Sequence, residues 1–193
     1  KITGIRPEFE EIDLTDGEVT RDFFARHSDI RAVIHFAALK AVGESVSKPL
    51  EYYFNNLNSL MNVLTCMREF KVPNLVFSSS CTVYGQADVL PVTEKTPRHE
   101  AESPYGNTKV MSEDIIRDLM RVEPDMKALA LRYFNPIGAH PTAFIGELPN
   151  GVPNNLIPYL TQTAIGIREQ LSVFGDDYNT PDGSPLRDYI DVV

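Results

Sequence analysis

Short β-type runs alternate with long helical patterns along this chain. Three runs rich in aliphatic residues, 32–37, 75–80 and 128–133, have the length and composition of buried strands. Between them lie two segments, 48–70 and 104–122, in which apolar residues recur at helical spacing. Parallel strands need a crossover of a dozen or more residues, usually a helix, and these intervals are long enough. The alternation therefore predicts an α/β fold in which helices cover a parallel sheet.

The character of the sequence changes after Pro136. Prolines and glycines punctuate the residues that follow, so regular elements there are expected to be short. We therefore divide the chain into 1–136 and 137–193. Four shorter elements are also expected: a strand at 10–14 that ends near Asp13, a helix at 20–27, a helix at 155–167 and a strand at 171–174.

The composition limits the classes of function. The 193 residues include 42% hydrophobic side chains, enough to bury the core of one domain or of one and a part. A net charge of −9 and a pI of about 4.9 argue against a nucleic-acid surface, which needs clustered Lys and Arg. No stretch of the sequence is long and apolar enough to cross a membrane. The two cysteines, Cys66 and Cys81, are expected to be free thiols, which fits a reducing cytoplasm.

A hydroxyl, a phenol and an ammonium are expected to meet at the end of one strand. Ser80 closes the run 75–80, and the carboxyl ends of parallel strands open into binding sites. Tyr105 and Lys109 are four residues apart on a predicted helix, so they share one face. A tyrosine ordinarily titrates near pH ~10, and a neighbouring positive charge lowers that pKa toward the range of a useful base. Ser80 can donate and accept, so it can pass a hydrogen bond between a substrate alcohol and Tyr105. The combination indicates a redox enzyme that uses a nicotinamide cofactor.

Six sets of segments, read in order, follow the pattern of one known family. They are 34–45, 52–56, 78–85 with 105–109, 131–139, 154–159 and 187–190. In these segments the chain resembles the extended short-chain dehydrogenase/reductases, and among them the UDP-galactose (UDP-glucose) 4-epimerases. The resemblance implies a Rossmann-type parallel sheet, partial in this chain, with the start of a smaller substrate-binding lobe. On this reading 1–136 form a partial NAD-binding domain and 137–193 begin the UDP-sugar-binding region.

The resemblance also implies an activity and its setting. The enzyme would be an isomerase of galactose metabolism that interconverts UDP-galactose and UDP-glucose with bound NAD, through a transient 4-keto sugar. It would form a homodimer through the two long helices. The composition, as argued above, indicates the cytoplasm and neither a nucleic acid nor a membrane as a partner.

The matching positions assign roles to individual residues. Tyr105 is implied to be the base and acid, Ser80 the hydrogen-bond bridge, and Lys109 the residue that tunes the pKa of Tyr105 and binds the nicotinamide ribose. No metal is implied. The implied cofactor-binding residues are Asp13, Leu14, Phe36, Ala37, Ala38, Lys40, Asn55, Tyr105, Lys109 and Phe134. The implied substrate-binding residues are Lys40, Ser80, Tyr105, Tyr133, Asn135, Asn155, Phe174 and Arg187.

Some of these assignments also have a physical argument. Lys40 directly follows a strand expected to be buried, where a charge is costly unless an anion is near. Asn55 is expected to be a buried amide on the cofactor side of its helix. Arg187 suits a diphosphate because its guanidinium forms a bidentate fork. His35 is expected to be an ordinary core histidine.

Three related functions differ in how far the residues that they would need at this site match this chain. A nucleotide-sugar 4,6-dehydratase places Asp-Glu directly after the strand-end hydroxyl, and here Cys81-Thr82 occupy that place. Another nucleotide-sugar 4-epimerase, such as a UDP-glucuronate 4-epimerase, shares the Ser, Tyr and Lys and stays an alternative. A non-catalytic dinucleotide-binding relative commonly loses the Tyr or the Lys, and this chain keeps both.

The ends of the sequence lack features that the resemblance would require. A dinucleotide fold normally opens with a strand, a glycine-rich turn and a helix that holds the pyrophosphate, and no such pattern precedes Lys1. The family's last substrate residues would lie beyond Val193. The chain is therefore expected to be an interior fragment that binds NAD weakly and does not turn over by itself.

Overall fold

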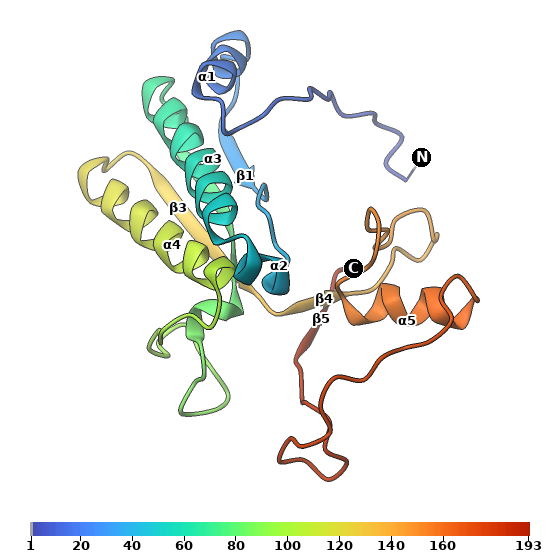
Figure 1. Cartoon of the computed structure of the whole chain (residues 1–193). Helices are drawn as coiled ribbons and strands as arrows, with labels where there is room; N and C mark the ends of the chain where they lie inside the picture. The colour runs from blue at the N-terminus through green and yellow to red at the C-terminus, as the bar shows by residue number, and fades with distance from the viewer. Residues whose placement is uncertain (1) are drawn as a thin grey trace. The chain divides into compact units, whose positions relative to one another are not determined.

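The computed structural model describes residues 2–193, and Figure 1 gives the order of the elements. The chain forms two compact units. One unit is Phe9–Tyr133, and the other combines the residues up to Glu8 with Phe134–Val193. Each unit is described by itself below. No helix within residues 2–193 is long and apolar enough to cross a membrane.

The first unit is built on a parallel sheet with the strand order β1-β2-β3. In the register of this sheet, His35 pairs with Phe77 and Ser80 pairs with Tyr133. This result confirms the predicted α/β fold with a parallel sheet. The strands are β1 (Ala32–His35), β2 (Asn74–Ser80) and β3 (Lys127–Tyr133).

Helices connect these strands, and side-chain caps and prolines mark where several of them begin. The Asp16 carboxylate caps the first helix by accepting hydrogen bonds from two backbone N–H groups. Ser103 caps the fourth helix, whose first residue is Pro104, and Pro49 opens the third. The helices are α1 (Gly17–Arg26), α2 (Val42–Ser47), α3 (Pro49–Glu69) and α4 (Pro104–Val122), with a 3-10 turn η1 (Cys81–Tyr84) after β2.

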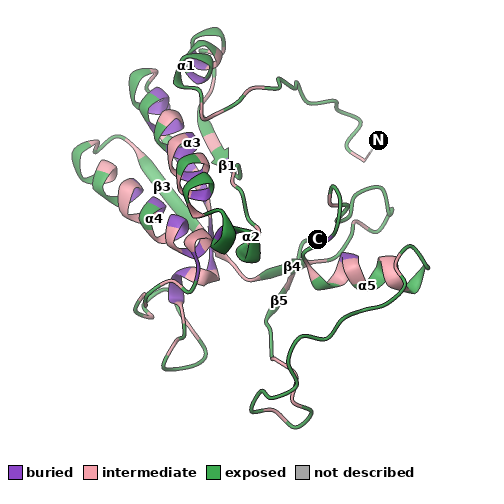
Figure 2. Cartoon of the chain, viewed as in Figure 1, coloured by how far each residue is buried: buried purple, intermediate pink, exposed green. Residues whose placement is uncertain are grey.

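The core of this unit lies where α3 packs against α1, α4 and the central strand. Figure 2 shows that buried residues gather on α3 and α4. Leu60 and Met67 of α3 are fully buried, and Phe77 of β2 is almost so. Burial of one large apolar side chain contributes about 1.5–3 kcal/mol, so this cluster holds the helices on the sheet. Its members are Phe24, Leu60, Val63, Leu64, Cys66, Met67, Val72, Leu75, Phe77 and Ile116.

The second unit contains a short parallel ladder and one helix. Strand β4 (Asn135–Ile137) pairs with β5 (Tyr189–Asp191), so residues more than fifty positions apart in the sequence lie side by side. Gly138 follows β4 with a φ of +113°, and a Cβ at this position would meet the Asp191 carboxylate at 2.7 Å. The helix is α5 (Leu156–Ala164). Among the described residues, neither β4 nor β5 was expected from the sequence.

Two predicted strands are wrong. Residues 10–14 form no strand, because no described strand pairs with them. At the end of this segment the Asp13 carboxylate accepts hydrogen bonds from the N–H and the hydroxyl of Thr15, and the backbone turns. Residues 171–174 are irregular and exposed, with 86% of Phe174 accessible, so no buried face supports a strand there. The helix predicted to end at residue 167 ends at Ala164, near Gly166 with its positive φ.

Candidate functional site

Ser80 lies at the junction between β2 and η1. It is the last residue of the strand, its backbone is extended, and its side chain is buried. The hydroxyl oxygen accepts a hydrogen bond from the N–H of Thr82 at 3.3 Å. A hydroxyl can still donate its own proton while it accepts this bond. Ser80 therefore keeps a donor at the carboxyl end of the sheet.

Tyr105 occupies the first turn of α4. The Ser103 hydroxyl accepts a hydrogen bond from Gly106 N–H at 3.1 Å, and this cap fixes the turn that carries the half-buried tyrosine. Burial raises the pKa of the Tyr105 phenol, while its hydrogen-bond interaction with the Ser80 hydroxyl lowers it; the net direction is upward. The structure thus brings the phenol and the strand-end hydroxyl together, as the sequence predicted.

Lys109 lies one turn further along the same helix and is buried. Its ammonium donates a hydrogen bond to the Ser78 carbonyl at 2.8 Å and lies 4.9 Å from the centre of the Phe77 ring and 5.8 Å from that of Tyr105. Burial lowers the pKa of Lys109 to about 8. The expected lowering of the Tyr105 pKa by Lys109 is not found in this chain: burial raises that pKa, and the interaction that lowers it is the hydrogen bond with Ser80.

His35 is a second titratable group in this buried region. It ends β1, and its ring stacks on Phe77 with 6.0 Å between the ring centres. Burial lowers its pKa to about 4, and the charge of Lys109 acts in the same direction. His35 is therefore neutral at physiological pH, in keeping with the expected core histidine.

Asn56 joins three segments around the site, and the sequence analysis did not single it out. Its amide oxygen accepts from Leu39 N–H at 2.8 Å, and its amide nitrogen donates to the Leu39 carbonyl and the Thr108 hydroxyl at 3.0 and 3.1 Å. Thr108 in turn donates to the Tyr105 carbonyl at 2.7 Å. The buried amide predicted at Asn55 is therefore Asn56, while Asn55 is only half-buried.

A hollow of about 430 Å³ lies beside β1. Its lining includes Leu14, Phe36 and Ala37, so the structure brings three of the predicted cofactor residues together. Ala38 follows them and is half-buried.

Lys40 requires a correction. It is exposed in the loop after β1, so its charge carries no burial cost, and the physical argument for an anion beside it fails. Its assignment then depends only on the family resemblance.

The substrate residues predicted near the sheet and in the second unit differ in their surroundings. Tyr133 pairs with Ser80 across the β2–β3 ladder and stacks on Phe36, with 6.4 Å between the ring centres. In the second unit, the Asn135 amide donates to the carbonyl of Asp188, the residue that follows Arg187, at 2.9 Å. Phe134 is half-buried, Asn155 bonds to Glu147 through its amide, and Phe174 is exposed.

Comparison with known proteins places these features in a family context. Residues 1–193 match the sequence model of the NAD dependent epimerase/dehydratase family. UDP-glucose 4-epimerase of Mus musculus is 54% identical over 193 residues, which cover 100% of this chain and 55% of that protein. The Yersinia pestis UDP-glucose 4-epimerase is 50% identical over 192 residues, covering 100% of this chain and 56% of the relative.

A solved structure that the chain resembles is also a UDP-glucose 4-epimerase. The crystal structure of UDP-glucose 4-epimerase from Bifidobacterium longum in complex with NAD+ and UDP matches with a TM-score of 0.95 at 47% identity. The match covers 99% of this chain and 57% of that one. The chain spans about half the length of the curated relatives that it matches.

Proposed function

Because the chain belongs to the NAD dependent epimerase/dehydratase family, we propose that the whole protein carrying it interconverts UDP-galactose and UDP-glucose by inversion at C4. The observation that carries this proposal is the convergence of Ser80, Tyr105 and Lys109 at the end of β2 and the start of α4. Relatives at 50–54% identity that are named UDP-glucose 4-epimerase support the choice of reaction.

The residues of the first unit fit a bound NAD. The Lys109 ammonium has three donors, and the Ser78 carbonyl takes one, so donors remain for the hydroxyls of a ribose. The hollow beside β1 offers apolar side chains, among them Leu14 and Phe36, to an adenine or nicotinamide ring. When bound, NAD would supply the hydride transfer from C4 of the hexose and back to the opposite face of the ring.

Tyr105 moves the proton in this proposal. Its phenolate takes the proton from the C4 hydroxyl and later gives it back, so it acts first as base and then as acid. Ser80 donates to the sugar oxygen and links it to the phenol. Burial works against the phenolate, so the nearby Lys109 charge and the positive charge of the oxidised cofactor must offset it.

The residues proposed to contact the UDP-sugar are assigned in each unit by itself. We assign Tyr133 to the sugar because it pairs with Ser80 in the sheet, and Phe134 to the nicotinamide side. In the second unit, Asn135 and Arg187 lie at the start of the β4–β5 ladder, and the exposed guanidinium of Arg187 suits the diphosphate. We retain Asn155 and Phe174 as substrate residues and Lys40, Asp13, Ala38 and Asn55 as cofactor-side residues on the resemblance alone.

We propose a homodimer in the cytoplasm as the working form. Phe54 and Met61 on α3 and Met111 on α4 are large apolar residues that are 62%, 41% and 38% exposed. A second copy that packs α3 and α4 into a four-helix bundle would cover them. Neither Cys66 nor Cys81 forms a disulfide within the described residues, which suits a reducing compartment. Phe54→Asp should convert a dimer to a monomer in analytical ultracentrifugation; an unchanged mass would reject this interface.

The experiment is a substrate test on the whole protein. UDP-galactose and UDP-glucuronate are supplied separately without added reductant, and the products are resolved by chromatography. UDP-glucose formed from UDP-galactose supports the proposal. Conversion of UDP-glucuronate alone would keep the mechanism and reassign the substrate, and conversion of neither sugar would favour a non-catalytic relative.

A further inference from the structure

A carboxylate lies on the face of α4 that carries the two reactive groups. Glu113 follows Tyr105 and Lys109 at the same helical spacing, so the three side chains project from successive turns. Only 9% of the Glu113 side chain is exposed. Because no sugar chemistry proposed above uses this buried charge, its position calls for another explanation.

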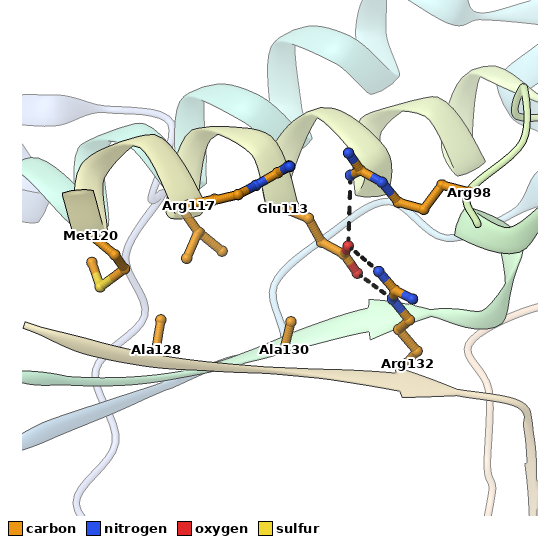
Figure 3. A pocket seen from close by; sticks show the side chains of 8 residues that line it. Arg98, Glu113, Arg117, Met120, Ala128, Ala130 and Arg132 are labelled. Carbon is orange, nitrogen blue, oxygen red and sulfur yellow. Dashed lines mark hydrogen bonds and ion pairs between the residues drawn. The ribbon is translucent and has the colours of Figure 1, made fainter. Parts of the chain in front are cut away.

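Both carboxylate oxygens of Glu113 are engaged by groups from the sheet. One oxygen accepts from the Ser79 hydroxyl at 2.6 Å and from Arg132 Nε at 2.9 Å, and the other accepts from Arg132 Nη2 at 2.7 Å. Arg98 approaches the second oxygen to 3.7 Å. Figure 3 shows the carboxylate between the guanidinium groups of Arg98 and Arg132. The contact with Arg132 is a bidentate fork, which fixes orientation as well as distance.

The partners of Glu113 are the sequence neighbours of site residues. Ser79 and Arg132 are paired across the β2–β3 ladder, and the next pair in the register is Ser80 with Tyr133. The Arg132 guanidinium also lies 4.7 Å from the centre of the Tyr84 ring in η1, the turn that follows Ser80. Arg132 therefore contacts the chain on both sides of Ser80.

The charges of this cluster hold each other in the ionised state. Burial acts to raise the pKa of Glu113, but the hydrogen bonds from Arg132 and Ser79 outweigh it, and the pKa is lowered. The hydrogen bond to Glu113 raises the pKa of Arg132. A buried pair with satisfied hydrogen bonds has a defined geometry, whereas removal of one partner leaves a charge without compensation.

We propose that Glu113 and Arg132 form a positioning pair for the reaction: they join α4 to the ends of β2 and β3 and so fix the Tyr105 phenol against the Ser80 hydroxyl. Neither residue touches the reacting atoms, so the pair acts through the backbone of Ser79, of Tyr133 and of the helix. The kinetic part of this proposal rests on the proposed 4-epimerase function.

The first test is kinetic and uses the whole protein, with rates expressed per bound NAD. Glu113→Gln keeps the size of the side chain and removes its charge. We expect kcat for UDP-galactose to fall by about 10²-fold, the cost of a misplacement near 1 Å, with KM changed less than about threefold. The matched control is Asp118→Asn, which breaks an exposed ion pair with Arg121 on the same helix and should leave kcat unchanged.

The second test needs no turnover. The ultraviolet absorbance of phenolate is titrated in the wild type and in Glu113→Gln, and the curve of the matching Tyr105→Phe protein is subtracted from each. If Ser80 no longer meets the phenol, the pKa of Tyr105 should rise in Glu113→Gln and stay unchanged in Asp118→Asn, because the Ser80 interaction is what lowers it.

The outcomes of these tests distinguish failure of the positioning role from failure of the proposed 4-epimerase function. Wild-type kcat per bound NAD together with an unchanged Tyr105 titration in Glu113→Gln would overturn the positioning role, even if the melting temperature falls. If Glu113→Gln does not fold, Arg132→Lys, which keeps the charge and loses the fork, is judged by the same two readouts. If the wild type converts no UDP-galactose, the proposed function fails, and the titration alone decides the role of the pair.

Discussion

The Lys109 ammonium donates a 2.8 Å hydrogen bond to the Ser78 carbonyl, which joins the face of α4 that carries Tyr105 to the strand that carries Ser80. This bond places a cation in a region where only 5% of the lysine is exposed. One carbonyl replaces only part of the hydration that the ammonium loses, so the charged form is disfavoured in the folded chain. The buried charge of Lys109 therefore lowers the free energy of unfolding, and the size of this effect can be measured.

Lys109→Met should make the protein more stable at pH 7 and less active. The pKa of Lys109 is lowered by burial from the ordinary 10.5 to about 8, so between these values the unfolded chain binds more protons than the folded one. The free energy of unfolding should then rise with pH from 8 to 10.5 in the wild type. We expect the variant to lack this rise. At pH 7 its free energy of unfolding should be about 2 kcal/mol higher than that of the wild type, because removal of the buried charge outweighs the loss of the Ser78 hydrogen bond.

Urea unfolding of NAD-free protein at several pH values from 7 to 10 measures this difference. The variant's kcat should fall by about 10²-fold or more. A constant difference in unfolding free energy across the pH range would contradict the account of a buried, partly compensated charge at Lys109.

His35 should titrate at an unusually low pH. Its pKa is lowered to about 4 by burial and by the charge of Lys109, and NMR can follow the titration of its ring. Because the folded pKa lies below the ordinary 6.5, the stability that depends on neutral His35 is lost as pH falls from about 6.5 to 4. We expect one imidazole to titrate near pH 4 and to shift upward in Lys109→Met. Titration of His35 near 6.5 would contradict its burial.

Asn56→Ala should destabilise the first unit. The substitution leaves the N–H and the carbonyl of Leu39 without the amide partner that they have in the structure, and Thr108 loses a donor. The bond to Thr108 is buried, whereas the two bonds to Leu39 are only partly buried. An unsatisfied buried group costs about 1–3 kcal/mol, so we expect a loss of about 1–2 kcal/mol in urea unfolding. Asn58→Ala, at a half-buried position on the same helix, is the control and should cost less than half as much. Equal losses of unfolding free energy in the two variants would mean that the hydrogen bonds of Asn56 do not stabilise the fold more than an ordinary position on this helix does.

Much of the first unit could be predicted from its apolar pattern. The strands around Leu75 and Ala128 and the helices that begin at Pro49 and Pro104 follow the predicted ranges closely. The helices α3 and α4 and the strand β2 each bury one face, and this burial leaves a periodic trace in the sequence. Strand β3 was expected to be buried, but Lys127–Ala130 are exposed and no residue of the strand is fully buried. The meeting of Ser80 and Tyr105 could also be predicted, because strand ends and helix starts meet at one edge of a parallel sheet.

Other features depend on contacts that have no periodic trace. The turn at Asp13 is stabilised by its hydrogen bonds to Thr15, which the alternation of apolar residues does not reveal. The three-residue strand at Asn135 exists only because Tyr189 pairs with it from far along the chain. Lys40 follows β1 as expected but is exposed, because it lies in the loop after the strand and not in the sheet.

Glu113 could have been found from the sequence. It continues the spacing of Tyr105 and Lys109 by one more turn, and a carboxylate on a helix face expected to pack on a sheet needs a cationic partner. The identity of that partner, Arg132, required the register that pairs it with Ser79.

The most direct test of the proposed function compares two Tyr→Phe variants in the whole protein. Tyr105→Phe removes the phenol assigned as base and acid, while Tyr53→Phe removes a hydroxyl that accepts a hydrogen bond from Asn107 on the same helix α4. Both proteins are incubated with UDP-galactose, and UDP-glucose is measured by chromatography per bound NAD. We predict that Tyr105→Phe loses about 10²- to 10⁴-fold in kcat and that Tyr53→Phe stays within about threefold of the wild type. Wild-type kcat in Tyr105→Phe would contradict the assignment of Tyr105 and the mechanism built on it.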